Sequence, residues 1–440
     1  MSEKTSNKGK IFSLVFAATM PFFAQSAQVE PFAAGERVVV LGDSITHGGS
    51  YVGNLQLFQC LRNPGCGTLF MSAGLSGDTA GGCLGRFARD VAEKRPDRVL
   101  VMFGMNDVGH NLYTKDAAKQ KDLQAKREGV FKRYETNMNK VHELIAKTGA
   151  KAVYITPTPY DEYSDNPKKA ANKDCNEYGL FTLAGKVRKL AAEKKTSFIE
   201  LYKPFTELVK KHPGRFHGDR VHPGGEGHLI MTAMIFEQAG NSPFVGKCEI
   251  DAGELPYKYE PKAFPLPLSD LYRKAEEVYP LTEKLNREML VIKGLKPGKW
   301  TLCADGKALG DFSAEELAAG VNIAILPTPG QLEAQKLARV AGGITAAMSR
   351  MCTFFAMFDR VKKCGGDPEN RESAFSALDK WVEGLYSNKV STATYYSNCA
   401  KSFKKTFVER AAIEKRLDEQ RAELNAARPK PYVISVKAAR

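Results

Sequence analysis

Short apolar runs alternate with longer amphipathic stretches between Arg37 and Gln238. The runs are rich in β-branched residues, whereas the stretches between them repeat apolar residues at the spacing of a helix. The expected strands are Arg37–Leu41, Thr68–Ser72, Arg98–Phe103, Lys151–Thr156 and Ser197–Leu201. The expected helices are Leu55–Leu61, Arg86–Lys94, Leu123–Lys147, Leu180–Lys194 and Gly224–Gln238. Strands separated by helices of this length predict crossover units and a parallel sheet, and therefore an α/β fold.

The alternation of strands and helices stops after this region. Residues 246–288 are rich in Pro, Glu and Tyr, and we interpret them as a linker that wraps the first domain. Residues 289–330 carry short apolar runs between turn residues, which predicts a small β unit. Its expected strands are Leu290–Ile292, Lys299–Ala304, Lys307–Leu309 and Val321–Leu326. Within it, Ser313 and Glu316 have the spacing of a capping box and predict a short helical turn.

Residues 331–428 return to helical spacing and predict a helical extension, with later helices at Ala374–Tyr386 and Thr392–Ala427. We expect its aromatic residues to pack between the helices, and a glycan-binding platform is the alternative. Two prolines end the last helix, and residues 429–440 contain a further apolar run. A terminal strand is marginal alone, so we expect this one to return to the small β unit.

Composition and charge narrow the class of protein. Hydrophobic residues make up 43% of the 440 residues and charged residues 26%, which excludes a disordered chain and a polytopic membrane protein. The net charge is +14, and residues 331–440 contribute +8 of it, with 20 basic and 12 acidic side chains. Both signs are mixed there, so we do not expect nucleic acid as a partner. The positive charge of the extension allows the cell envelope as a partner.

The first 27 residues have the pattern of a secretory signal peptide. Three lysines precede the apolar run Ile11–Ala24, and the small residues Ser26 and Ala27 follow it. An uncleaved membrane anchor is the alternative. A signal peptide would direct export, which predicts a secreted or periplasmic protein. Disulfides can persist in those compartments. Of the nine cysteines, Cys60 and Cys66 flank a tight turn and form the expected local disulfide. The alternative is that most of the cysteines are small, buried apolar residues of the core.

Polar motifs follow several predicted strands, at the end of the strand where parallel α/β sheets bind ligands. Each motif is a common turn when taken alone, but their order along the chain indicates one site. The motifs are Gly42-Asp43-Ser44, Ala73-Gly74-Leu75-Ser76-Gly77-Asp78-Thr79, Gly104-Met105-Asn106-Asp107 and Asp219-Arg220-Val221-His222-Pro223.

These residue types suit acyl transfer through a serine nucleophile. A serine such as Ser44 needs a base to take its proton, and His222 can do so near neutral pH. Asp219, three residues earlier, can hold the histidine ring and stabilise its cation. Backbone N–H groups at Gly77 and Ser44, together with the Asn106 amide, can stabilise the oxyanion of the tetrahedral intermediate.

This set of residues resembles the SGNH, or GDSL, family of esterases and acylhydrolases over roughly Glu36–Gly240. The resemblance implies a three-layer, flavodoxin-like hydrolase domain, placed at residues 28–245, that uses no metal and no cofactor. The family's named residues are all present. The one departure is Ser72, which stands where the second motif commonly opens with Asn and which supports the loop.

We therefore expect a secreted serine esterase that hydrolyses small acyl esters, with acetyl esters on a carbohydrate as the substrate. A lipid-directed acylhydrolase is one alternative, although the sequence shows no long apolar lid. A non-catalytic glycan-binding or cell-envelope protein is the alternative from another class. The sequence does not give the oligomeric state.

The other polar residues near these motifs receive structural interpretations. His47 and His110 are expected to be exposed loop residues, with pocket lining as the alternative. His217 and His228 are expected to be structural, and no cluster has the spacing of metal ligands. Asp43 is expected to bond backbone N–H groups.

Overall fold

The computed structural model describes residues 28–113, 117–165 and 172–439, and the side chains of 117–121 are not described. The expected signal peptide, residues 1–27, lies outside the described residues.

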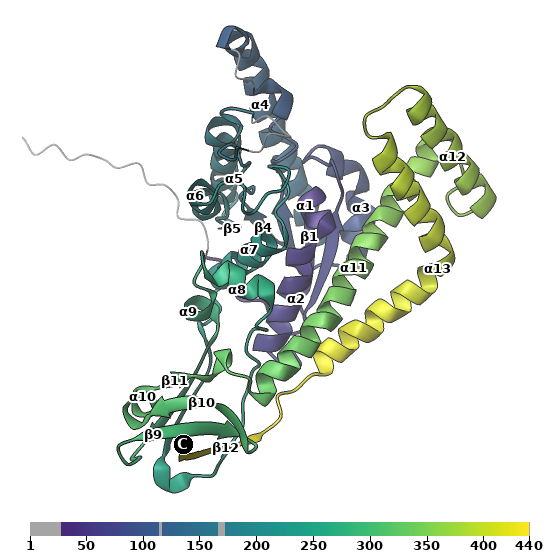
Figure 1. Ribbon diagram of the computed structural model, residues 1–440. Coiled ribbons are helices and arrows are strands. Elements are labelled where there is room, and N and C mark those ends of the chain that lie inside the picture. Colours follow the sequence, from purple (N-terminus) through teal and green to yellow (C-terminus); the bar gives the residue numbers. More distant parts are fainter. Residues whose placement is uncertain (1–27, 114–116, 166–171, 440) are drawn as a thin grey trace, which may run out of the picture.

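A five-stranded parallel sheet forms the centre of the N-terminal domain (Figure 1). Its order, β2-β1-β3-β4-β5, is that of a flavodoxin-like sheet. The strands are β1 (Arg37–Gly42), β2 (Leu69–Gly74), β3 (Arg98–Met102), β4 (Lys151–Ile155) and β5 (Ser197–Ile199). All five predicted strands are confirmed, and β3 is buried along its whole length, as its apolar sequence predicts.

Helices cover both faces of this sheet and give the domain three layers. α2 (Ser50–Arg62) packs against α7 (Gly225–Gln238), whereas α4 (Ala117–Thr148) packs against α5 (Phe181–Glu193). The crossovers from β1 to β2 and from β3 through β5 place these pairs on opposite faces. The predicted three-layer α/β class is therefore confirmed.

Three helical details differ from the sequence prediction. α1 (Ser44–Gly48) and α6 (Tyr202–Lys211) were not expected, and α1 is too short to show a helical period. A single helix over Arg86–Lys94 is wrong, because the backbone leaves helical dihedral angles at Arg86 (φ −114°) and Val91 (φ −125°). That region consists of the 3-10 turn Gly82–Arg86, α3 (Phe87–Asp90) and the 3-10 turn Ala92–Lys94.

The interpretation of residues 246–288 as a linker is wrong. β6 (Phe244–Asp251) pairs in parallel with β8 (Arg287–Lys293), and β7 (Tyr257–Tyr259) belongs to a second sheet. α8 (Asp270–Glu276) packs against α7, and α9 (Leu281–Leu285) leads into β8. Few of the β6 side chains are buried, so its polar composition hid the strand.

The small β unit has two sheets, with strand orders β10-β9-β12-β7 and β11-β8-β6. The remaining bounds are β9 (Lys299–Ala304), β10 (Lys307–Ser313), α10 (Ala314–Ala319), β11 (Val321–Asn322) and β12 (Tyr432–Ala438). β12 lies between β9 and β7, so the end of the chain returns to the unit that precedes the extension. The capping box of Ser313 and Glu316 is present at the start of α10.

The predicted strand Val321–Leu326 is wrong beyond its first two residues. The Asn322 side chain accepts a hydrogen bond from the Ala324 N–H at 3.2 Å and caps the 3-10 turn Ile323–Ile325. The chain therefore leaves the sheet at Asn322, before the extension begins.

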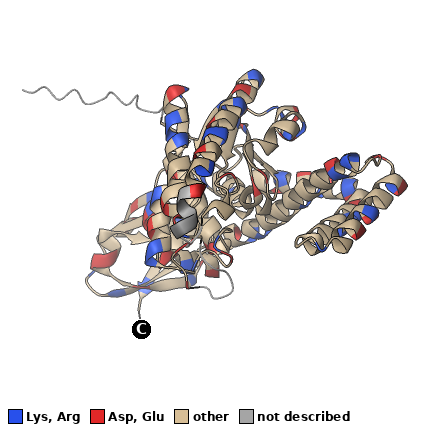
Figure 2. Ribbon diagram, turned by 90° about the horizontal axis from the view of Figure 1, so that it is seen from above, with Lys and Arg blue, Asp and Glu red and all other residues tan. Residues whose placement is uncertain are grey.

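Three helices form the extension: α11 (Pro329–Lys363), α12 (Arg371–Ser387) and α13 (Ala393–Ala426). α11 and α13 run side by side along the N-terminal domain, and α12 lies at the end far from the β unit (Figure 1). The buried rings of Phe354 and Phe403 stack with centroids 4.9 Å apart, so the aromatic core between helices is confirmed. Basic and acidic positions are interspersed along these helices (Figure 2).

The extension covers the open edge of the sheet, where β2 has only one neighbouring strand. The Arg421 guanidinium of α13 donates to the Phe70 carbonyl at 3.4 Å, and Cys352 of α11 contacts the Ser72 carbonyl at 3.8 Å. Covering an edge in this way prevents its pairing with another chain. By length and composition α11 alone, of the described helices, could cross a membrane, but it packs here on α2, β2 and α13.

All nine cysteines are free thiols, so the expected Cys60–Cys66 disulfide is wrong. The Cys60 thiol donates to Oδ1 of Asn425 at 3.2 Å instead. Cys60, Cys83, Cys175 and Cys303 are buried, in agreement with the alternative of small apolar core residues.

Candidate active site

The carboxyl ends of β1, β2 and β3 bring the predicted motifs to one edge of the sheet. Gly42, the last residue of β1, pairs with Gly74 of β2 and Met102 of β3. The loops that follow these three strands therefore start from neighbouring points, and they carry three of the predicted site residues.

Ser44 is the first residue of α1, directly after the turn that leaves β1. The Asp43 carboxylate caps this helix by accepting from the Ile45 N–H at 3.0 Å, which confirms its scaffold role. Burial raises the pKa of Asp43 to about 7. A Cβ at Gly42 would lie 2.8 Å from the Met102 carbonyl oxygen, so this turn requires glycine.

The structure places Ser44, His222 and Asp219 in one hydrogen-bonded chain. The Ser44 hydroxyl lies 2.7 Å from His222 Nε2, and His222 Nδ1 lies 2.7 Å from Asp219 Oδ2. Because the carboxylate can only accept here, Nδ1 carries the proton and Nε2 is free to accept from the serine. About half of each of the His222 and Asp219 side chains is exposed, so the chain opens to solvent.

The loop that carries His222 is fixed by backbone bonds. The second oxygen of Asp219 accepts from the N–H groups of Val221 at 3.0 Å and His222 at 2.8 Å. Burial alone would raise the pKa of Asp219. The hydrogen bonds from the His222 ring and from these N–H groups have the larger effect and hold the pKa well below its ordinary value. A bridge between His217 and Pro223 closes the loop.

Gly77 and Asn106 lie in adjacent loops that are bonded to each other. Asn106 Nδ2 donates to the carbonyl of Asp78, the residue after Gly77, at 2.9 Å. Gly77 has φ +77°, a left-handed conformation that favours glycine, and its N–H finds no acceptor among the described residues. This backbone donor is therefore available to a ligand.

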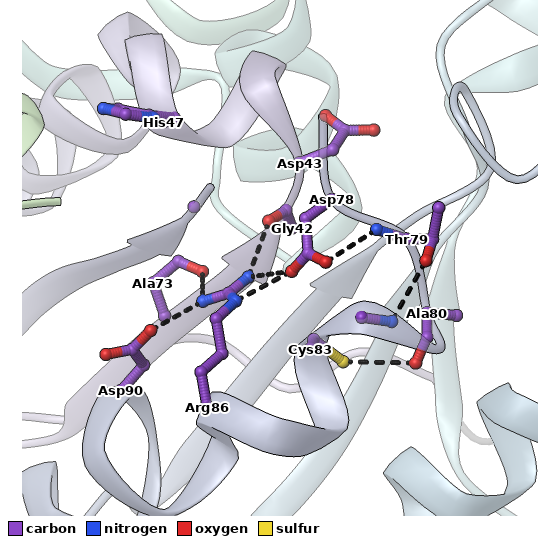
Figure 3. Close-up of polar contacts among 12 residues, drawn as sticks. Gly42, Asp43, His47, Ala73, Asp78, Thr79, Ala80, Cys83, Arg86 and Asp90 are labelled. Carbon is purple, nitrogen blue, oxygen red and sulfur yellow. Dashed lines mark hydrogen bonds and ion pairs between the residues drawn. The ribbon is translucent and has the colours of Figure 1, made fainter. Parts of the chain in front are cut away.

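Arg86 joins the ends of two strands to the second motif, and sequence reasoning missed it. Its buried guanidinium donates to the Gly42 carbonyl at 3.1 Å and the Ala73 carbonyl at 2.8 Å (Figure 3). It also pairs with Asp78 at 2.7 Å and Asp90 at 2.9 Å. The only signal in the sequence was a charged residue in a segment expected to be an amphipathic helix.

Two further carboxyl groups are buried beside these loops. Burial raises the pKa of Asp78 although Arg86 opposes the shift, and burial raises that of Asp107 to about 7. Asp107 Oδ1 accepts from the Ala80 N–H at 3.0 Å and so ties the third motif to the second.

A cavity of about 570 Å³ opens beside Asn106, between the motif loops and α4. Polar side chains make up much of its wall, among them Thr79, Asn106, Asn111, Lys126, Arg133 and Asn137. Such a wall can offer hydrogen bonds to a ligand rich in hydroxyl groups.

The remaining predicted residues have structural positions. Ser72 supports its loop, since its hydroxyl donates to the Thr46 carbonyl at 3.2 Å. His217 and His228 are buried, as expected, and burial lowers the pKa of each to about 4. The expectation that His47 and His110 are exposed loop residues is wrong. His47 is buried, and His110 is half-buried against Tyr160.

Within the described ranges, no group of three or more His, Cys, Asp or Glu side chains is placed to hold a metal ion.

Comparison with known proteins assigns the domain that carries this site. Residues 40–230 match the family model described as GDSL-like Lipase/Acylhydrolase. Residues 40–230 belong to this family. The chain is accordingly a carboxylic ester hydrolase, and the GDSL domain lies within the three-layer α/β region.

One similar protein matches about half of the chain, and a solved structure matches most of it. An acetylxylan esterase from Geobacillus stearothermophilus is 26% identical over 223 residues, which cover 47% of this chain and 95% of the relative. A solved structure of a gut microbial diltiazem-metabolizing enzyme covers 94% of this chain and 99% of its own, with a TM-score of 0.81 and 24% identity. That likeness shows that the fold, extension included, recurs in another protein.

Proposed function

We propose that the protein is a serine esterase that removes small acyl groups, above all acetyl, from a carbohydrate. Ser44 is the nucleophile, His222 the general base and acid, and Asp219 the group that orients His222. The backbone N–H groups of Ser44 and Gly77 and the side chain of Asn106 form the oxyanion hole.

The hydrogen-bonded chain Ser44–His222–Asp219 carries this proposal. Its two distances of 2.7 Å match a nucleophile, a base and an orienting carboxylate already in reach of one another. The ionised state of Asp219, favoured by its lowered pKa, suits the stabilisation of a transient imidazolium.

The reaction follows from these positions in two steps. Ser44 Oγ bonds to the ester carbonyl carbon while its proton passes to His222 Nε2. The oxyanion that forms accepts hydrogen bonds from the N–H donors of the oxyanion hole. Collapse breaks the bond to the alcohol, which takes the proton from His222 and leaves an acyl-serine. Water then attacks the acyl-serine through the same base, so that the acid departs and Ser44 is regenerated.

The carbohydrate part of the proposal has two supports. One is the named activity of the Geobacillus relative. The other is the polar wall of the cavity that Asn106 lines, although Ser44 and His222 do not line it. A lipid acyl chain would favour an apolar wall instead, because each buried CH₂ contributes about 0.8 kcal/mol. We also propose that the protein is exported to the periplasm or outside the cell, on the pattern of residues 1–27.

Acetate release across a panel of acetylated polysaccharides tests the proposal, with Ser44→Ala as the matched inactive variant. We expect release by the wild-type protein from at least one glycan and none by Ser44→Ala. Activity that rises steadily with acyl length on aryl esters would instead indicate a lipid acylhydrolase. Glycan binding without hydrolysis of any ester would indicate a binding protein.

A further inference from the structure

His47 connects the GDSL domain to the extension from a position three residues after Ser44. Its Nδ1 lies 3.1 Å from the Ser76 N–H, and its Nε2 lies 3.1 Å from the Ser349 carbonyl and 2.9 Å from the Thr353 hydroxyl. A backbone N–H can only donate, so Nδ1 is the acceptor and the proton sits on Nε2, facing α11. The neutral ring therefore links Ser76 to the extension, and burial keeps the His47 pKa below its ordinary value.

A second helix of the extension comes close to the same residue. The Tyr395 side chain, near the start of α13, lies beside the Ser76 side chain, and burial raises the Tyr395 pKa to about 12. The Ser76 hydroxyl also lies 3.1 Å from His47 Nδ1. α11 thus holds Ser76 through His47, and α13 places Tyr395 beside it.

Ser76 immediately precedes Gly77, the backbone donor of the proposed oxyanion hole. On the other side of Gly77, Asp78 is held by Arg86 and Asn106, all within the GDSL domain. The loop is therefore fixed at one end by its own domain and at the other by the extension. An oxyanion donor contributes only if it lies close to the position that the charged oxygen will take.

We propose that the helical extension is a positioning element of the active site. Through His47 and Tyr395 it sets the place of the Ser76–Gly77 segment, and so controls how strongly the Gly77 N–H stabilises the transition state. This inference rests on the proposed serine-esterase function.

Tyr395→Phe tests the contribution of α13 by removing one oxygen from the half-exposed ring that lies beside Ser76. Tyr386→Phe is its matched control, because Tyr386 is also half-exposed and its hydroxyl lies near Thr394 and Ser397 of the extension. With an aryl acetate we expect kcat to fall several-fold in Tyr395→Phe, with little change in KM, and no change in Tyr386→Phe.

His47→Gln tests the indirect link, since its longer amide can reach α11 but leaves the Ser76 N–H without its acceptor. His47→Asn keeps an acceptor near the Nδ1 position but is too short to reach α11, so it breaks the same link at its other end and kcat should fall as well. We expect kcat in His47→Gln to fall by up to about 100-fold, the lower end of the cost of losing an oxyanion donor. Inhibition by an arylboronic acid, which forms a tetrahedral adduct on the serine, should weaken in parallel.

The outcomes separate this inference from the proposed function. If the wild-type protein and Ser44→Ala hydrolyse the ester equally, the serine-esterase function itself fails. If hydrolysis depends on Ser44 but Tyr395→Phe and both His47 variants keep the kcat and boronate affinity of the wild-type protein, the function stands and the positioning role is overturned.

Discussion

Asp219 illustrates how single atoms divide the work of this site. One carboxylate oxygen faces the His222 ring, and the other accepts two backbone N–H groups of the same loop. The position of the ring and the shape of the loop therefore depend on the same side chain, but on different oxygens.

Replacing only the oxygen that faces the ring separates these two tasks. In Asp219→Asn the amide oxygen can still accept from the loop, whereas the NH₂ group faces His222 Nδ1 and favours the wrong tautomer. We expect kcat on an aryl acetate to fall about 10⁴-fold while the melting temperature changes little. The exposed carboxylate of Asp379, paired with Lys404 on the extension, gives the control variant Asp379→Asn, which should be fully active.

The residues of this hydrogen-bonded chain were predictable from the sequence because each belongs to a short motif. Ser44 comes directly after β1, and Asp219 and His222 share the loop between α6 and α7. Arg86 was not predictable, since its partners include two main-chain carbonyls that only the folded sheet brings together. His47 was placed wrongly for a related reason. The helix α11 that buries it begins almost three hundred residues later in the chain.

At the scale of elements, the loop after β2 depends on a buried ion pair. Arg86 and Asp78 are each about 5% exposed, and the guanidinium also binds the ends of β1 and β2. Secondary structure on either side would survive its loss, but the loop that carries Gly77 would lose its anchor.

Arg86→Met should therefore destabilise the fold as well as the site. Leaving the buried Asp78 carboxylate without its cation costs about 3–5 kcal/mol in the free energy of unfolding, which denaturant titration measures. Adding Asp78→Asn should restore part of that loss, because the unpaired charge is removed. Arg89→Met, at a guanidinium that is 24% exposed, should cost clearly less. Equal stability of Arg86→Met and the wild-type protein would contradict this account of the loop.

The β unit contains a carboxyl group whose titration should be visible in its stability. Glu288 of β8 is buried, and it accepts a hydrogen bond from the Tyr259 hydroxyl at 2.8 Å. Burial raises its pKa to about 7, so between pH 4.5 and 7 the folded chain holds a proton that the unfolded chain releases. The contribution of Glu288 to stability is therefore greatest below pH 4.5 and declines as the pH rises toward 7.

Glu288→Gln removes this titration while keeping an acceptor for Tyr259. We expect the melting temperature of the variant, relative to that of the wild-type protein, to rise between pH 4.5 and 7 and then level off. The exposed Glu249, paired with Lys293, provides the control Glu249→Gln. A difference that stays constant across this pH range would rule out the raised pKa.

At the scale of the whole molecule, the GDSL domain, the β unit and the helical extension are connected and pack together. The GDSL domain runs into the β unit through β6, the extension leaves that unit at α11, and β12 returns to it between β9 and β7 (Figure 1). The extension lies against β2 and α2 rather than apart from the domain. His47, three residues after Ser44, is thus bonded to Ser349 and Thr353 of the extension, from the last hundred residues of the chain.

The sequence pattern predicted the parallel sheet well, because its strands are short, apolar and separated by helices. It failed between β6 and α9, where strands with one exposed face have the composition of a linker. It also could not show how the extension docks, because those contacts join side chains far apart along the chain.

The central claim is that His222 activates Ser44 as a nucleophile, and covalent labelling tests it most directly. A fluorophosphonate reacts with an activated serine, forming a phosphorus–oxygen bond as fluoride leaves, and mass spectrometry of the digested protein locates the adduct. We predict a single adduct on Ser44 in the wild-type protein, none in Ser44→Ala, and much slower labelling in His222→Ala. Labelling at another residue, or at Ser44 with the same rate in His222→Ala, would contradict the account.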